Sequence, residues 1–205
     1  METQFRSVLS KYLPEESLDF IVKLFVDNGV SLVVTKSRKT KLGSFIQRKG
    51  KVPLITINFN LNPYYFLVVL VHELAHYFSW KKNQNKRVAP HGQQWKNEFG
   101  ILLKQLIGMR MFPEDLVETI LNYINHNFNS TKANFELNYV LSKYQKINDD
   151  KILLVDLEDG SEFYYKKKKY RKVITKSSRC HCIKIDDKLN RKYSFHLLTE
   201  INVSE

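Results

Sequence analysis

Two histidines and a glutamate stand close together in the middle of the chain, in the order His72, Glu73, Leu74, Ala75, His76. On a helix, residues four positions apart lie one turn above each other on the same face, so both imidazoles can reach one metal ion. Glu73 lies roughly 100° further round the helix, from where its carboxylate can reach a water on that metal. The pattern is typical of a zinc site that hydrolyses peptide bonds.

The sequence around this motif favours the metal over a purely structural role. Two histidines in a buried helix are more often core or capping residues than ligands, and a motif this short also occurs by chance. Here, Asn62 and Pro63 are typical of an N-cap and a first helical residue, and residues 64–71 are apolar on nearly every side. Burying three ionisable side chains in such a helix without a metal or partners would be costly.

A third ligand is needed, because catalytic zinc usually takes three protein ligands and keeps one position open. His91 is the best candidate, since the polar segment before it can turn the chain back towards the first motif. Glu98 is the alternative, as in peptidases whose third ligand is a glutamate on a second helix. Lys82 occupies the position where another peptidase class has its third histidine, and His126 is too far along the chain.

Three segments carry a family resemblance, and they span roughly residues 5 to 110. In order they are Lys41-Leu42-Gly43 continuing to Ile55-Thr56-Ile57-Asn58, then the H-E-L-A-H motif, then His91-Gly92 followed by Trp95-Lys96. Together they resemble the SprT-like metalloprotease family, to which the Spartan DNA–protein crosslink proteases belong. The resemblance implies a zincin-like fold with His72, His76 and His91 as zinc ligands and Glu73 as the catalytic acid/base. It also implies a protease that acts on proteins bound or crosslinked to DNA.

Charge gives an independent argument for an anionic partner. The chain has 33 Lys and Arg against 21 Asp and Glu, a net charge of +12. Basic residues gather in residues 36–51 and 166–192. Tyr164, Tyr165, Tyr170 and Tyr193 lie in or beside the second run and offer rings on which bases could stack. The residues that we assign to nucleic-acid contacts are Arg38, Lys39, Lys41, Arg48, Lys49, Lys166, Lys167, Lys168, Lys169, Arg171 and Lys172.

Such contacts would hold DNA without sequence specificity, because lysine contacts to phosphate do not read bases. The simpler alternative is that the basic runs are solvated surface and the tyrosines are core residues.

The C-terminal part departs from the family pattern. Many relatives end in a zinc ribbon with two pairs of cysteines, whereas this chain has only Cys180 and Cys182, with His181 between them and His196 further on. A second, structural zinc on these four residues would be poorly spaced, because neighbouring residues of an extended segment point to opposite faces. We therefore expect one catalytic zinc and a β domain that keeps the place of the ribbon without its metal.

We expect an α+β protein: a metalloprotease domain over residues 1–130, a helical linker over 131–150 and a small basic β domain over 151–205. The periodicity predicts a first helix over residues 14–27, strands over 31–35, 42–47 and 53–59, helices over 62–81, 93–107 and 113–127, and four or five antiparallel strands after residue 151. Hairpin turns are expected at Asp159-Gly160 and at residues 186–190. Residues 133–146 are ambiguous.

The expected function is that of an ATP-independent zinc endopeptidase acting on DNA-associated proteins. Two alternatives are a catalytically inactive, zinc-containing nucleic-acid-binding protein and a small metallopeptidase unrelated to DNA. The chain has no signal-peptide core, and its longest apolar run is too short to span a bilayer. We therefore expect a cytoplasmic monomer, associated with the nucleoid where it binds DNA.

Overall fold

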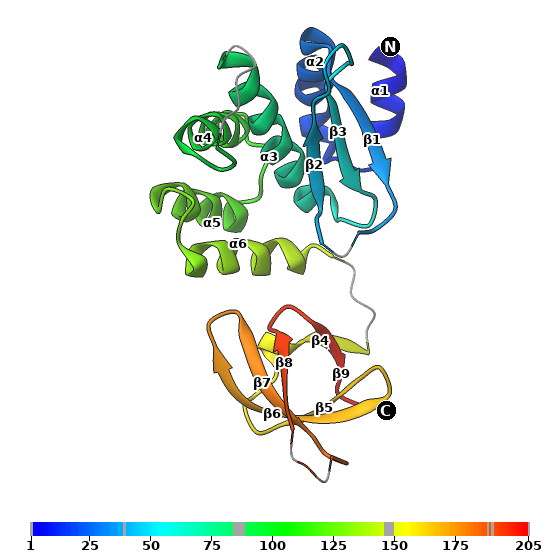
Figure 1. Cartoon of the computed structure of the whole chain (residues 1–205), viewed down its shortest axis with the longest axis vertical. Coiled ribbons are helices and arrows are strands. Elements are labelled where there is room, and N and C mark those ends of the chain that lie inside the picture. Colours follow the sequence, from blue (N-terminus) through cyan, green and yellow to red (C-terminus); the bar gives the residue numbers. More distant parts are fainter. Residues whose placement is uncertain are drawn as a thin grey trace. The chain divides into compact units, whose positions relative to one another are not determined.

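The computed structural model of the chain describes residues 2–38, 40–83, 89–145, 150–187, 189 and 191–204. The chain folds as a mixed α+β protein in two compact units, Met1–Asn129 and Ser130–Glu205. Figure 1 shows the helices concentrated in the first unit and the longer antiparallel strands in the second.

A short mixed sheet and a set of helices form the first unit. Its strands are β1 (Ser31–Thr35), β2 (Gly43–Ile46) and β3 (Leu54–Asn58), in the order β1-β3-β2. β1 runs parallel to β3, and β2 runs antiparallel to it. β2 is therefore an edge strand, and the side that does not pair with β3 faces away from the sheet. The helices are α1 (Glu2–Leu9), α2 (Leu18–Asn28), α3 (Pro63–Lys82), α4 (Gln93–Gly108) and α5 (Glu114–Asn125), with a 3₁₀ turn at Glu15–Ser17.

Helix α3 is the central element of this unit. Asn62 caps it as expected, since its side chain accepts a hydrogen bond from the Tyr65 backbone N–H at 2.9 Å, and Pro63 is the first helical residue. Most of its side chains between Phe66 and Tyr77 are buried, and it packs against β2, β3 and α4. The apolar character of residues 64–71 thus reflects burial on several sides.

The predicted elements of the first unit match the observed ones within a few residues, with one omission. Helix α2 ends at Gly29, whose φ of 60° lies in the left-handed region that glycine adopts without strain. The sequence did not predict α1, because its apolar residues are few and only Leu9 is buried. Phe5 reaches α2 through its ring contact with Phe25.

The second unit is a curled antiparallel sheet with one helix. Six strands follow the order β4-β9-β5-β6-β7-β8, one or two more than the sequence predicted. They are β4 (Lys151–Leu153), β5 (Glu162–Tyr165), β6 (Lys168–Lys176), β7 (Arg179–Lys184), β8 (Lys192–His196) and β9 (Glu200–Asn202), with a 3₁₀ turn at Leu154–Asp156. Inward side chains of the strands, together with Leu154 of the 3₁₀ turn and Leu197 after β8, form the core of this unit: Leu154, Phe163, Tyr170, Cys180, Cys182, Leu197 and Ile201.

Two expectations for this part of the chain are wrong. Helix α6 (Thr131–Lys143) is not a linker but part of the second unit, because Phe135 packs against its core and Tyr139 donates a 2.6 Å hydrogen bond to Asp156. Asp159 and Gly160 form a turn but no hairpin, since β4 pairs with β9 and not with β5. The turn predicted over residues 186–190 falls between the paired strands β7 and β8, and residues 188 and 190 lie outside the described residues.

In the described part of the chain, no helix combines the length and apolar character that crossing a membrane requires.

Candidate metal centre

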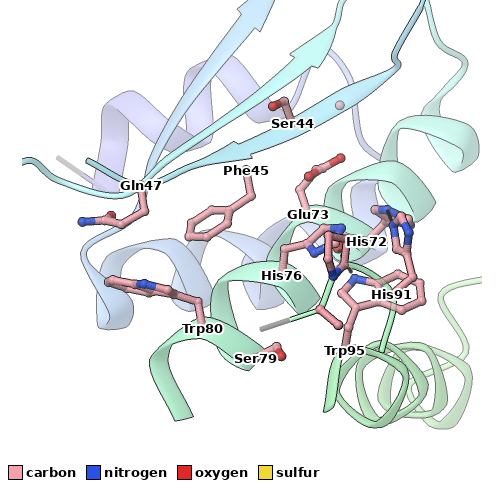
Figure 2. A pocket seen from close by; sticks show the side chains of 13 residues that line it. Ser44, Phe45, Gln47, His72, Glu73, His76, Ser79, Trp80, His91 and Trp95 are labelled. Atoms are coloured by element: carbon pink, nitrogen blue, oxygen red, sulfur yellow. Dashed lines mark hydrogen bonds between the residues drawn. The ribbon is translucent and has the colours of Figure 1, made fainter. Parts of the chain in front are cut away.

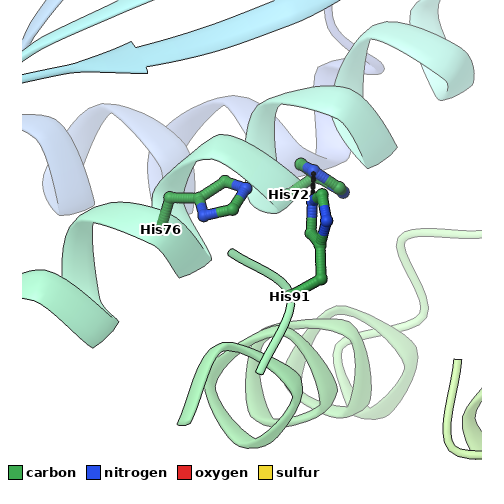
Figure 3. A group of neighbouring side chains, drawn as sticks. All are labelled: His72, His76 and His91. Atoms are coloured by element: carbon green, nitrogen blue, oxygen red, sulfur yellow. Dashed lines mark hydrogen bonds between the residues drawn. The ribbon is translucent and has the colours of Figure 1, made fainter. Parts of the chain in front are cut away.

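Three imidazoles converge at one point of the first unit. His72 and His76 extend from the same face of α3, and His91 approaches them from the segment before α4 (Figure 3). One ring nitrogen of each lies within 4.8 Å of the other two, and the Nε2 atoms of His72 and His91 are 3.1 Å apart. Among the described residues, these three are the histidine, cysteine and acidic side chains close enough together to bind a metal ion.

His91 is held in place by an unusual backbone conformation. Its φ is 57°, in the left-handed region, which costs a residue with a side chain roughly 1 kcal/mol. The next residue, Gly92, donates its backbone N–H to the carbonyl of Ala89 at 3.0 Å and then serves as the N-cap of α4. This tight turn directs the His91 ring back towards α3.

The Trp95 indole packs against all three histidine rings. It is the third residue of α4, is 3% exposed, and its ring centroid is 4.7, 5.5 and 4.6 Å from those of His72, His76 and His91. Its indole N–H donates a 3.2 Å hydrogen bond to the backbone carbonyl of His72. Trp95 therefore connects α4 to α3 at the level of the first histidine and restricts the positions of the three rings.

Burial keeps the histidines neutral. It lowers the pKa of His72 to about 3 and that of His76 to about 4, and the neighbouring imidazoles lower both pKa values further. The pKa of His91 is also lowered by burial. Because a metal binds the neutral imidazole, these lowered pKa values leave the nitrogen lone pairs available at neutral pH.

Glu73 lies beside the trio but on the side of α3 that faces the sheet (Figure 2). It is 6% exposed, and burial raises its pKa to about 7. A hydrogen bond from the Phe45 backbone and the nearby charges of Arg38 and Lys41 oppose that shift. The carboxyl group thus titrates near neutrality, as expected of a group that exchanges protons at the pH of the cell.

Gly43 makes room for this carboxyl group. A Cβ atom at position 43 would lie 2.6 Å from Glu73 Oε1 and 2.8 Å from a methyl carbon of Val69. Real side chains do not approach so closely, so a glycine at position 43 is what allows β2 to lie this close to Glu73 and Val69.

The trio and Glu73 line a cleft of about 670 Å³. β2 and the residue that follows it form one wall, to which Gly43, Ser44, Phe45 and Gln47 contribute. α3 and residues 89–95 form the other side. Figure 2 shows the histidines at one end of the cleft and Gln47 and Trp80 at the other.

The residues present suit a metal ion. The Nε2 atoms of His72 and His91 are 3.1 Å apart, a distance at which two lone pairs repel unless a proton or a cation lies between them. The alternative ligand Glu98 is engaged elsewhere, because its carboxylate pairs with Lys82 at 2.8 Å. The trio of His72, His76 and His91 is therefore the metal-binding set that the geometry supports.

The basic residues predicted in the first unit do not all face solvent. Lys41, Arg48 and Lys49 are exposed, and Lys39 lies outside the described residues. Arg38 is half-buried, and its guanidinium donates to the side chains of Asn58 and Thr56 at 2.8 and 2.9 Å. Arg38 therefore has a structural role instead of the predicted phosphate contact, since its hydrogen bonds connect the segment before β2 to β3.

In the second unit, the predicted basic residues also separate into groups. Lys166, Lys167 and Lys168 are exposed at the turn between β5 and β6, and none forms an ion pair with a described carboxylate. Lys169 and Arg171 both pair with Glu162, at 2.7 and 2.8 Å. Lys172 is 4% exposed and donates to the Leu157 carbonyl while it pairs with Asp159, so it is a core residue and no phosphate contact.

The tyrosines of the second unit are mostly core residues. Tyr170 is 6% exposed and belongs to the core, and Tyr165 and Tyr193 pack against it. Tyr164 lies on the other face of β5, opposite Lys169, whose ammonium is 5.7 Å from its ring centroid. One of the four rings is therefore placed for contact with a partner.

Cys180 and Cys182 are also core residues. Their sulfur atoms are 3.6 Å apart on the inner face of β7, and burial raises the pKa of Cys182 to about 12. His181 alternates to the opposite face of the strand, and His196 forms a ring contact with Phe135. The four residues considered for a second zinc do not share one side of the sheet.

The sequence analysis assigned no role to Gly43, Phe45 or Trp95, although all three lie in the segments that carry the family resemblance. A glycine inside a strand is a signal of close backbone approach, but it does not name the atom that is approached. The spacing of His91 and Trp95 gives no comparable signal, because His91 lies before α4 with a left-handed backbone.

Comparisons of this chain with protein-family models, with curated proteins and with solved structures found no match.

Replacing Trp95 by phenylalanine should weaken metal binding by about tenfold, because outer-shell partners of metal ligands typically carry effects of this size. The variant loses the hydrogen bond to the His72 carbonyl and part of the surface on which the three rings rest. The measurement is competition for Zn²⁺ or Co²⁺ with a chelator of known affinity.

Trp80→Phe is the matched control, because Trp80 lines the same cleft and forms ring contacts with Phe45 and Tyr77. Equal metal affinities for the two variants would remove Trp95 from this supporting role.

The affinity for the metal should change little on mild acidification. A lowered pKa means that the neutral ligand persists as pH falls, so His72 and His76 compete little with protons down to about pH 5, and His91 remains the main site of proton competition. Three ordinary imidazoles would lose about three orders of magnitude in affinity per pH unit below about 6.5. We expect roughly one order or less.

This slope is best measured between about pH 7 and 5.5 in Glu73→Gln protein, which removes the titration of that carboxyl group. A slope near three protons would show that the imidazoles are not depressed.

Proposed function

We propose that this protein is a zincin-like, SprT-type zinc endopeptidase that cleaves proteins bound to DNA. The observation that carries the proposal is the position of Glu73, a buried carboxyl group with a pKa near 7 next to three convergent imidazoles in an open-sided cleft. A structural metal site needs four closed ligands and no such neighbour.

Zinc is the ion that the donor set favours. Three imidazole ligands with one open position are the usual protein contribution to catalytic zinc, although other first-row ions also accept imidazole. Zinc, when bound, lowers the pKa of water and polarises a carbonyl group.

The protein itself supplies the proton transfer. The Glu73 carboxyl group accepts a hydrogen bond from the Phe45 backbone N–H and lies against Gly43, where there is no side chain to displace it. Its carboxylate therefore keeps a fixed direction. A dication held by the histidine trio would lower the pKa of Glu73 by direct attraction and would favour its ionised form. Glu73 would accept a proton from the water that attacks the peptide carbonyl and would give it to the amine that leaves when the C–N bond breaks.

β2 offers a docking edge for an extended peptide. It lies at the edge of the three-stranded sheet and lines the cleft, with its other side paired to β3. A peptide that adds to this edge as a further strand has its backbone held by main-chain hydrogen bonds, whatever its sequence. An endopeptidase that acts on many different proteins needs such sequence-tolerant binding.

The second unit supplies a charged tip suited to DNA. The hairpin between β5 and β6 turns at Lys166 and Lys167, whose φ values of 51° and 60° form a tight two-residue turn. Glycine or asparagine usually occupies such a turn, so two lysines there are locally strained. With Lys168 they present three ammonium groups at one end of the sheet.

Glu73→Gln is the direct test of the peptidase. We expect cleavage of denatured casein to fall by about two to four orders of magnitude, because the general base is lost. Zinc content measured by elemental analysis should stay at one equivalent per chain, since Glu73 is not among the three ligands. The exposed Glu118→Gln variant is the control. Unchanged proteolysis in Glu73→Gln protein would remove Glu73 from its role.

Binding to DNA should depend on the lysine tip and on salt. A triple Lys-to-Gln variant at residues 166, 167 and 168 should lower the slope of log affinity against log salt by about two to three, because each lost phosphate contact removes about 0.9 for duplex DNA. Anisotropy titrations of a labelled duplex and a labelled single strand measure this slope.

The matched control is a triple Lys-to-Gln variant at the exposed Lys11, Lys23 and Lys104. Absence of binding to either DNA even at low ionic strength would reduce the proposal to a peptidase unrelated to DNA. DNA binding without cleavage of any protein would instead support an inactive binding protein.

A further inference from the structure

The start of β2 is held by a buried polar network to which the proposed reaction gives no role. Its centre is Asn58, the last residue of β3, which is 1% exposed. Asn58 Nδ2 donates to the backbone carbonyls of Arg38 at 3.2 Å and of Lys41 at 3.1 Å. The Asn58 backbone N–H donates to the carbonyl of Leu42 at 2.9 Å. One buried residue thus fixes three carbonyls of the segment that leads into β2.

The guanidinium group of Arg38 completes this network. Its Nε donates to Asn58 Oδ1 at 2.8 Å, and its Nη1 donates to Thr56 Oγ1 at 2.9 Å. Its Nη2 reaches the carbonyls of Leu42 and Thr56 at 3.3 and 3.4 Å. A guanidinium holds its donors in a planar fork, whereas a lysine offers a single nitrogen. Only an arginine can therefore serve all of these acceptors at once.

β2 is held less firmly by packing than its neighbour β3. It pairs with β3 over four residues at the edge of the sheet, and all four are only half-buried. In β3, four of the five residues are buried. Its first residue, Gly43, also has no side chain that could pack. The position of β2 therefore depends more on the hydrogen bonds at its start.

The position of β2 in turn decides how Glu73 is held. Gly43 directly follows Leu42, and a Cβ atom on it would lie 2.6 Å from Glu73 Oε1. Two residues later, the Phe45 backbone N–H donates a hydrogen bond to the Glu73 carboxyl group. Figure 2 shows the Glu73 side chain directed from α3 towards β2. A displaced β2 would therefore release this carboxyl group from its fixed direction.

The same displacement would leave the metal ligands in place. The three histidines belong to α3 and to the segment before α4, and the network contacts neither of these through a printed hydrogen bond of Asn58 or Arg38. Asn58 and Arg38 are also not among the described residues that line the cleft. Any effect of these two residues on a reaction in the cleft must pass through β2.

We infer that Asn58 and Arg38 are positioning residues of the proposed reaction, because they fix β2 where the Phe45 N–H meets the Glu73 carboxyl group. The inference rests on the proposed peptidase function and extends it to two residues outside the cleft. A misplacement of a catalytic group by about 1 Å costs a reaction about a hundredfold in rate. Loss of the network should therefore impair catalysis far more than metal binding.

The kinetic test replaces Asn58 by alanine in zinc-loaded full-length protein. Its initial rate on saturating denatured casein should fall by about ten- to a hundredfold, with zinc affinity within about threefold of the wild type. In Glu73→Gln protein, the same substitution should change the residual rate by less than about twofold, because the group that β2 positions is already lost. A purely structural role would lower the rate by the same factor in both backgrounds.

Arg38→Lys is the second variant, and it keeps the positive charge where Asn58→Ala lowers the yield of folded protein. It should lose rate in the same way, because one ammonium group cannot replace the guanidinium fork. Asn28→Ala is the matched control, since the Asn28 amide bonds to Leu24 and Lys81 on the helices α2 and α3.

A second readout needs no cleavage. Deuterium exchange of the Phe45 backbone N–H, followed by NMR, should be at least about tenfold faster in Asn58→Ala or Arg38→Lys than in wild-type or Asn28→Ala protein. Unchanged exchange, or equal losses of rate with and without Glu73, overturns the inference and leaves the peptidase standing. Faster exchange with no cleavage by the wild type supports the placement of β2 by this network and overturns the peptidase.

Discussion

The first unit depends on the burial of ionisable groups in a helix that is otherwise apolar. Helix α3 places His72, Glu73 and His76 among side chains that have almost no contact with water. Burial forces each group towards its neutral form, so the imidazoles keep their lone pairs and the carboxyl group titrates near pH 7. The surrounding features, namely the strained turn at His91, the indole of Trp95 and the glycine at position 43, are arranged around these groups.

The sequence allowed good predictions where local pattern and tertiary structure agree. The N-cap at Asn62, the spacing of His72 and His76 and the strands before α3 follow from periodicity and capping, which act over a few residues. His91 was the preferred third ligand, and it lies with the other two histidines, whereas Glu98 is neutralised by Lys82. Helix α1 was missed because it buries little apolar surface of its own.

The remaining errors have one physical origin, which is that charge and aromatic character do not reveal burial. Arg38 and Lys172 look like members of basic runs, yet each is fixed by hydrogen bonds inside its unit. Tyr170 looks like a stacking platform and is instead a core residue. The period of two along β6 placed Lys172 on the inner face, and only the pairing with β5 and β7 shows which face that is.

The contact between Gly43 and Glu73 has an evolutionary consequence. A side chain at 43 would collide with residue 69 as well as with residue 73, so it is tolerated only where both have become smaller, and a smaller residue at 73 has lost the reach of glutamate. Sequences that retain glutamate at 73 are thereby confined to glycine at 43. The glycine becomes free to change only after both neighbouring side chains have become smaller, so a larger residue at 43 would mark sequences in which this packing has already been lost.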